Sequence, residues 1–121
     1  MRRLGLSALL LLALTGCGGS SGPTAQAVVD DFAAAGLAVP DVRDNTPQNC
    51  GSLGCTQLIT TEALTVVQFD DSAAAQRYAD AFADNAHLDG PIVLQYAAAR
   101  TPEDQRPGYE ARLREFLTAQ G

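Results

Sequence analysis

The apolar beginning of the chain most limits what the chain can fold into. Two of the first three residues are arginines, and residues 4–14 are apolar apart from Gly5 and Ser7. This stretch is too short for a membrane-spanning helix, which needs roughly 20 apolar residues. A charged start, a short apolar segment and small residues behind it are typical of a secretory signal, which is excluded from the mature fold. The part that folds therefore begins only after this leader.

The leader ends in Leu14-Thr15-Gly16-Cys17, and a run of glycine and serine follows up to residue 22. This motif resembles the lipobox of bacterial lipoproteins. The resemblance implies a diacylglyceryl lipid on the Cys17 sulfur and cleavage of the chain before Cys17. Two acyl chains anchor a protein stably, whereas one holds it only marginally. Cleavage without lipidation and an uncleaved anchor are the alternatives.

Three segments follow from this motif. We expect a signal peptide over 1–16, a lipidated cysteine with a flexible Gly/Ser tether over 17–23, and a single globular domain over 24–120. Hydrophobic residues make up 46% of the chain, which is enough for one modest core. The expected location is the outer, extracytoplasmic face of the cell membrane, reached through the lipid on Cys17.

The charge of the chain limits its partners. The formal net charge is −6, and all eight basic residues are arginine. An acidic domain is poorly suited to nucleic acid, so no nucleic-acid partner is expected. The abundance of alanine and the use of arginine without lysine resemble the small lipoproteins of high-GC Gram-positive bacteria.

Two further cysteines, Cys50 and Cys55, enclose the sequence Gly-Ser-Leu-Gly. In an exported protein this spacing predicts a structural disulfide, because the two glycines let the short loop bend. A redox-active pair usually has two intervening residues, and a zinc site needs about four ligands where this chain offers a single histidine, His87. We therefore expect no metal site and no cofactor.

Hydrophobic periodicity predicts three helices and three strands in the order α-β-β-α-β-α. The expected helices are 24–36, 70–85 and a segment from about 107 to the end, and the expected strands are 55–61, 63–69 and 91–98. Residues 38–54, rich in Pro, Asn, Asp and Gly, are expected to form an ordered loop.

These elements predict an α+β fold, a small two-layer sandwich. A three-stranded mixed sheet is expected, with strands 63–69 and 91–98 parallel because a helix connects them. The helices are expected to cover mainly one face of the sheet. The third strand can also join the other arm of the hairpin.

A parallel arrangement of those strands brings Gln68, Asp70, Tyr96 and Arg100 to one edge of the sheet. Ligands often bind at the carboxyl ends of parallel strands, and helix N-termini there attract anions. This edge is therefore the candidate ligand site. The alternative is that acidic residues only cap the helices and pair with Arg100.

The sequence contains no nucleophile elbow and no phosphate-binding loop. We therefore expect a non-catalytic accessory or binding module held at the membrane. Two alternatives remain: a structural component of the cell envelope, and a small hydrolase in which His87 meets carboxylates in a cleft.

Overall fold

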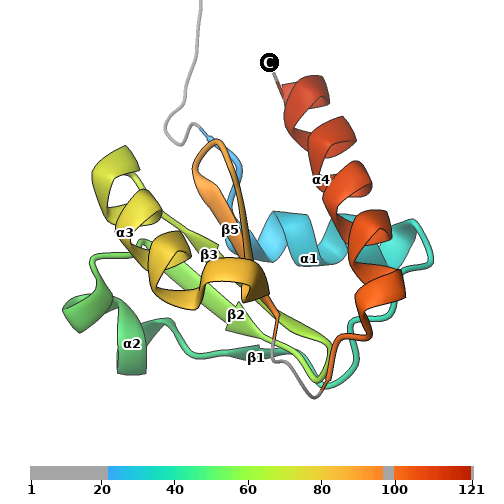
Figure 1. Ribbon diagram of the computed structural model, residues 1–121, viewed down its shortest axis with the longest axis horizontal. Coiled ribbons are helices and arrows are strands. Elements are labelled where there is room, and N and C mark those ends of the chain that lie inside the picture. Colours follow the sequence, from blue (N-terminus) through green and yellow to red (C-terminus); the bar gives the residue numbers. More distant parts are fainter. Residues whose placement is uncertain (1–21, 97–99, 121) are drawn as a thin grey trace, which may run out of the picture.

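The structure is a computed structural model that describes residues 22–96 and 100–120 (Figure 1). Within these ranges the helices are α1 (Ala25–Ala34), α2 (Thr46–Leu53), α3 (Ser72–Phe82) and α4 (Arg106–Gln120). The strands are β1 (Arg43–Asp44), β2 (Gln57–Thr60), β3 (Leu64–Gln68), β4 (Ala86–Asp89) and β5 (Ile92–Tyr96). Short 3-10 helices at Ala83–Asn85 and Glu103–Gln105 precede β4 and α4. None of the described helices has the length and apolar character needed to cross a membrane.

The strands form one five-stranded sheet in the order β1-β2-β3-β5-β4, and every neighbouring pair is antiparallel. The predicted α+β class is correct, but the predicted three-stranded mixed sheet and the α-β-β-α-β-α order are wrong. The predicted β2–β3 hairpin is present, with Ile59 opposite Val66. The strand after it in the sheet, β5, runs antiparallel to β3, with Leu64 opposite Tyr96.

Two strands were not predicted: β1, which lies in the segment expected to be a loop, and β4, which accounts for the wrong strand direction. Because β3 and β4 each pair antiparallel with β5, they run in the same direction. The crossover through α3 therefore does connect two strands of equal direction, but it leads to the edge strand β4. The chain then turns at Gly90-Pro91, between the paired residues Asp89 and Ile92. Gly90 has a φ of +58°, and β5 returns between β3 and β4.

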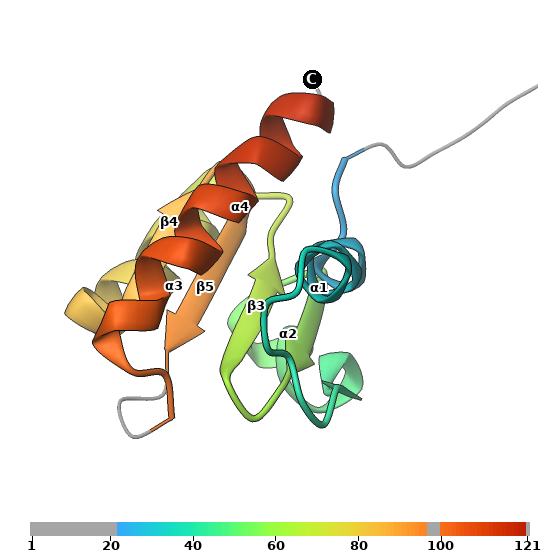
Figure 2. The ribbon, with the colours of Figure 1, turned by 90° about the vertical axis from the view of Figure 1, so that its right-hand side faces the viewer.

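Helices cover both faces of the sheet, so the expectation of one covered face is wrong. Figures 1 and 2 show α1 and α4 on one face and α2 and α3 on the other. The first face buries Val28, Phe32, Ile59, Val66, Leu94, Tyr109 and Leu113 among others. The second buries a smaller cluster of Cys50, Leu58, Val67, Phe69, Ala74, Ala75, Ala79 and Val93. Residues adjacent in one strand, such as Val66 and Val67, thus lie in different cores, as the two-residue period of a strand requires.

The predicted start and end of α1 are confirmed. The Thr24 hydroxyl accepts a hydrogen bond from the Ala27 N–H at 3.0 Å. Gly36 ends the helical segment with a φ of +86°, and the Leu37 N–H donates to the Phe32 carbonyl at 2.9 Å. Leu37 then packs against the core beneath α1, which gives the hydrophobic contact expected of such a helix end.

Residues 46–53, predicted as loop, form the helix α2. The carboxylate of Asp44 accepts from the Thr46 N–H at 3.0 Å, and Pro47 stands in the first turn, where its missing N–H costs nothing. Gly54 ends the helix in the left-handed conformation, with a φ of +79°. The predicted disulfide between Cys50 and Cys55 is present, with a Cα–Cα distance of 4.6 Å, and it joins the last turn of α2 to the residues before β2.

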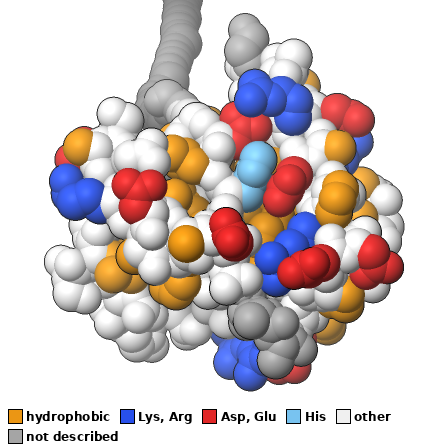
Figure 3. All heavy atoms as spheres, viewed as in Figure 1, with side chains coloured by type: hydrophobic (Ala, Val, Ile, Leu, Met, Phe, Trp, Pro, Cys, Tyr) orange, Lys and Arg blue, Asp and Glu red, His pale blue; other side chains and the backbone are white. Residues whose placement is uncertain are grey.

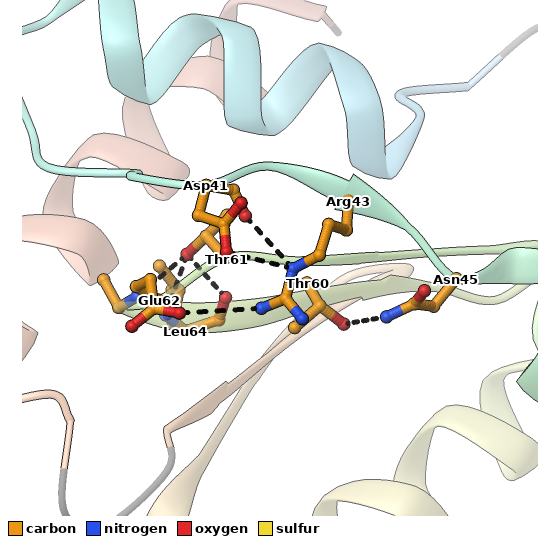
Figure 4. A network of polar contacts seen from close by, with 8 residues as sticks. Asp41, Arg43, Asn45, Thr60, Thr61, Glu62 and Leu64 are labelled. Atoms are coloured by element: carbon orange, nitrogen blue, oxygen red, sulfur yellow. Dashed lines mark hydrogen bonds and ion pairs between the residues drawn. The ribbon is translucent and has the colours of Figure 1, made fainter.

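The turn between β2 and β3 is held by one buried hydroxyl. The Thr61 oxygen accepts hydrogen bonds from the N–H groups of Ala63 (3.1 Å) and Leu64 (3.0 Å) and donates to the Leu64 carbonyl at 2.8 Å (Figure 4). Beside it, the exposed Arg43 side chain lies between the carboxylates of Asp41 and Glu62, at 3.4 and 3.9 Å.

Candidate functional site

A groove of about 590 Å³ lies between α2 and α3, and we call it the α2–α3 groove. Its floor is the face of the sheet that these two helices cover, and hydrophobic side chains reach the surface around α3 (Figure 3). The groove is lined by Asn49, Ser52 and Leu53 of α2, by Leu58, Thr60, Thr65 and Gln95 of the sheet, and by Ala74, Arg77, Tyr78, Ala81 and Phe82 of α3.

The α3 wall is a stripe at helical spacing. Residues 74, 77, 78, 81 and 82 follow one another at intervals of three, one, three and one, so they share one face of the helix. Tyr78 packs between Phe69 and Phe82, with ring centroids 5.6 and 5.0 Å apart. Tyr78 is half-buried, whereas Phe82 is 37% exposed. It forms a rim of the groove.

The α2 wall contributes Leu53, which is 38% exposed and faces the groove from the last turn of the helix. The disulfide holds this turn next to the start of β2, and the Thr46 hydroxyl accepts from the Leu58 N–H at 2.9 Å. The short helix is therefore fixed to β2 at both of its ends. Large apolar side chains exposed in a concave site are typical of ligand or partner contacts.

Polar side chains form part of the floor. Thr60 lies opposite Thr65, and Thr65 lies opposite Gln95, so these three side chains make a row across β2, β3 and β5. Thr60 accepts a hydrogen bond from the Asn45 amide at 3.1 Å. The Gln95 amide and the Thr65 hydroxyl make no hydrogen bond to another residue of the described part of the chain. They are half-buried donors and acceptors that face the groove.

The groove carries a single charge, that of Arg77, and no carboxylate among its lining residues. Arg77 forms no ion pair with any described residue, whereas Arg112 and Arg114 contact Asp31 and Asp89 at 2.7 and 2.9 Å. Burial raises the pKa of Tyr78, so its phenol stays protonated at neutral pH. A positive groove on an acidic protein favours an anionic ligand.

The four residues predicted to share a ligand site are not brought together. Because β3 and β5 are antiparallel, Gln68 and Asp70 lie at one end of the sheet and Tyr96 and Arg100 follow the other. The Gln68 side chain accepts from the Ala25 N–H at 3.2 Å, so it caps the start of α1. Gln68 and Asp70 line a smaller hollow beside Pro23 and Pro91.

Tyr96 is buried and belongs to a second polar cluster, between β5 and α4. Its hydroxyl donates to Glu110 Oε2 at 2.8 Å, and the Arg106 guanidinium lies 4.7 Å from the centre of its ring. Burial, together with the hydrogen bond to Glu110, raises the pKa of Tyr96. These contacts fasten α4 to the sheet.

His87 stands in β4, and its Nδ1 lies 3.7 Å from Glu110 Oε1. The carboxylate of Asp89, two residues further along β4, forms an ion pair with Arg114. The hydrolase alternative required His87 to meet two carboxylates in a cleft, and the structure brings it to one carboxylate of α4, outside the α2–α3 groove. No group of three or more metal-ligating side chains gathers within residues 22–96 and 100–120.

Two sets of predicted residues have different outcomes. Cys50 and Cys55 form the predicted disulfide, which joins the last turn of α2 to the residues before β2. Cys17 and the rest of the predicted leader and tether up to residue 21 lie outside the described residues. The groove itself was not predicted from the sequence, although the spacing of Arg77, Tyr78 and Phe82 carried a signal: an arginine within an otherwise apolar helical stripe.

Comparisons with known proteins identify no relative. No family model matches the chain, and neither a curated protein nor a solved structure matches it significantly.

Proposed function

We propose that this protein is a non-catalytic binding module, anchored at the outer face of the cell membrane through a lipid on Cys17, and that its binding element is the α2–α3 groove. The proposed membrane location rests on the leader over residues 1–16 and on the lipobox-like motif that ends at Cys17. A disulfide that joins α2 to the residues before β2 is compatible with an oxidising, extracytoplasmic location.

The groove is the observation that carries the binding role. A purely structural envelope component has no need of a concave surface, and single exposed apolar residues need no explanation. Here Leu53 and Phe82 are both exposed and both line the same groove, whose volume lies within the range of about 300–1,000 Å³ usual for small-molecule sites.

The lining residues favour binding over reaction. Hydroxyl groups of Ser52, Thr60 and Thr65 are present, but a hydroxyl nucleophile needs a base within hydrogen-bond reach. The lining contains neither histidine nor carboxylate to serve as that base. Elsewhere in the described chain, His87 and Glu110 contact one another and Asp31 and Asp89 pair with arginines.

The address is tested on the full chain, expressed in a Gram-positive host, by intact mass and cell fractionation. We expect the protein in the membrane fraction, with Cys17 as its first residue and the added mass of a diacylglyceryl group. Cys17→Ala is expected to leave the protein unprocessed and without that mass, whereas Ser20→Ala, in the tether, is expected to behave like the natural chain. A product that retains Met1 and carries no lipid contradicts the proposed address.

A further inference from the structure

We propose that the α2–α3 groove binds a free single-chain carboxylic acid, with its carboxylate on the Arg77 guanidinium and its apolar chain against Leu53, Tyr78 and Phe82. This inference rests on the proposed function only in taking the groove as the binding element. It does not depend on the lipid anchor.

The charge of the groove selects an anion. Arg77 is its only charged lining residue, on a chain with a net charge of −6. The three arginines of α4, by contrast, already have partners: Arg106 stacks on Tyr96, Arg112 pairs with Asp31, and Arg114 pairs with Asp89. A guanidinium offers a planar pair of N–H donors that matches the two oxygens of a carboxylate. Arg77 is thus positioned to hold one carboxylate, and an amine of the same shape would be repelled.

The polar floor selects a ligand that brings acceptor atoms. Gln95 and Thr65 lie half-buried in the groove, and neither side chain is hydrogen-bonded to another described residue. A purely apolar occupant, such as the hydrophobic face of a partner helix, would cover these groups and leave them without water or partner, which is unfavourable. A carboxylate can accept from the Gln95 amide as well as from Arg77.

The apolar walls select the remainder of the ligand. Leu53 and Phe82 lie on opposite helices at the rim, and Leu58, Ala74 and Tyr78 lie deeper. Covering Leu53 and Phe82 with a hydrocarbon chain removes apolar surface from water on both partners. A longer hydrocarbon chain in the ligand is therefore expected to bind more tightly, by up to about fourfold for each methylene that is fully buried.

The test uses a chain that begins at Gly22, because every residue of both hydrophobic clusters lies between Ala25 and Leu117. The probes are hexanoate, octanoate and decanoate, with decylamine as the cationic counterpart, each below its aggregation concentration. Amide chemical shifts locate the binding, and calorimetry measures the affinity. We expect saturable shifts confined to α2, α3 and the adjoining strand residues, affinity that rises from hexanoate to decanoate, and weaker binding of decylamine.

Two variants and one control make the test specific. Arg77→Gln keeps most of the side-chain stem and is expected to weaken decanoate binding by about tenfold or more, the loss typical of a hydrogen bond to a charged group. Ala81→Trp adds bulk from an exposed position in the groove and is expected to abolish binding of all the carboxylates. Arg114→Gln makes the same charge change on α4, across the sheet, and is expected to bind like the natural chain. Circular dichroism verifies that each variant is folded.

Equal affinity of decanoate and decylamine, equal effects of Arg77→Gln and Arg114→Gln, or shifts spread over α1 and α4 would each overturn the proposal. The two proposals fail separately. If the groove does not bind carboxylates, the membrane location is still tested by the intact mass of the full chain. If Cys17 carries no lipid, carboxylate binding by the folded part is unaffected.

Discussion

At the scale of single residues, a buried hydroxyl stabilises a hairpin turn that the usual turn residues do not mark. The β2–β3 turn lacks the Asn-Gly pair that usually marks a tight hairpin. Thr61 takes that role, because its hydroxyl, in a residue only 2% exposed, satisfies two backbone N–H groups and one carbonyl. The hairpin was predictable from its β-branched strands, but the means by which it turns was not.

Thr61→Val tests this role, since valine has the same shape and lacks the hydroxyl. We expect the free energy of unfolding to fall by about 1–3 kcal/mol, because the N–H groups of Ala63 and Leu64 lose their partner in a buried position. Urea denaturation provides the measurement. Thr118→Val, which removes an exposed hydroxyl from α4, is the control and is expected to change stability by less than about 0.5 kcal/mol. Similar values for the two variants would contradict the role of Thr61.

The Asp31–Arg112 pair predicts a loss of stability in acid. Two hydrogen bonds of 2.7 Å from the Arg112 guanidinium lower the pKa of Asp31 below its ordinary value of 3.8. A carboxyl whose pKa is lower in the folded state stabilises that state above its unfolded pKa, and this contribution disappears as the pH falls through the folded pKa. The predicted window therefore extends downward from about pH 4.

Denaturation as a function of pH checks this expectation. The natural chain should lose part of its stability below about pH 4, and Asp31→Asn should be less stable near neutral pH and show a smaller decline in acid. Asp30→Asn, an exposed change on the same helix outside the pair, should keep the decline of the natural chain. An unchanged acid decline in Asp31→Asn would show that other groups cause it.

At the scale of elements, the segments with strong periodicity were predicted and the weak ones were not. The helices α1, α3 and α4 and the strands β2, β3 and β5 show clear apolar patterns. The edge strand β4, with the sequence Ala-His-Leu-Asp, has little intrinsic strand preference and depends on its pairing with β5. A local signal for it existed, because the two-residue loop Gly90-Pro91 begins with glycine, which permits the positive φ that a tight hairpin turn needs.

Missing β4 also displaced the candidate site. With β5 taken as the return strand of the α3 crossover, Tyr96 and Arg100 were expected beside Asp70, whereas the extra hairpin reverses β5. The short helix α2 was missed for a different reason. Its apolar content is low, and its helical state depends on end signals, Pro47 at the start and Gly54 at the end, which can equally mark a loop.

Two glycines of the same segment test whether α2 forms in solution. Gly51 lies inside the helix with open space at its Cβ position, so Gly51→Ala is expected to stabilise the protein by about 0.5–1 kcal/mol. Gly54 has a φ of +79°, so Gly54→Ala is expected to destabilise it by about 1–2 kcal/mol, although its Cβ would meet only the Ala74 Cβ at 3.9 Å. Thermal and urea denaturation give both values. Two effects of the same sign would contradict a helix that ends at Gly54.

At the scale of the whole molecule, the two faces of the sheet serve different ends. The face under α1 and α4 is the larger core, and α4 is fastened there by Arg112, Arg114 and Glu110. The face under α2 and α3 is built with alanines and short elements, and it is polar at Thr60, Thr65 and Gln95. Because the helices on this second face leave part of the sheet uncovered, the fold has room for a groove there. The larger core and the proposed binding groove thus lie on opposite faces of the sheet.

Adjacent residues of β3 test this three-layer arrangement directly. Val66 and Val67 are both fully buried, yet Val66 faces α1 and Val67 faces α3. We expect Val66→Ala and Val67→Ala each to lower the free energy of unfolding by about 2 kcal/mol, because each leaves a cavity in a packed core. Thr65→Ala, on the groove floor, is the control and is expected to cost less than about 1 kcal/mol, since its side chain is only half-buried. A sheet covered on one face alone would lose stability from Val66→Ala and almost none from Val67→Ala, so equal losses require α3 to pack on the sheet in solution and thereby to form one wall of the groove.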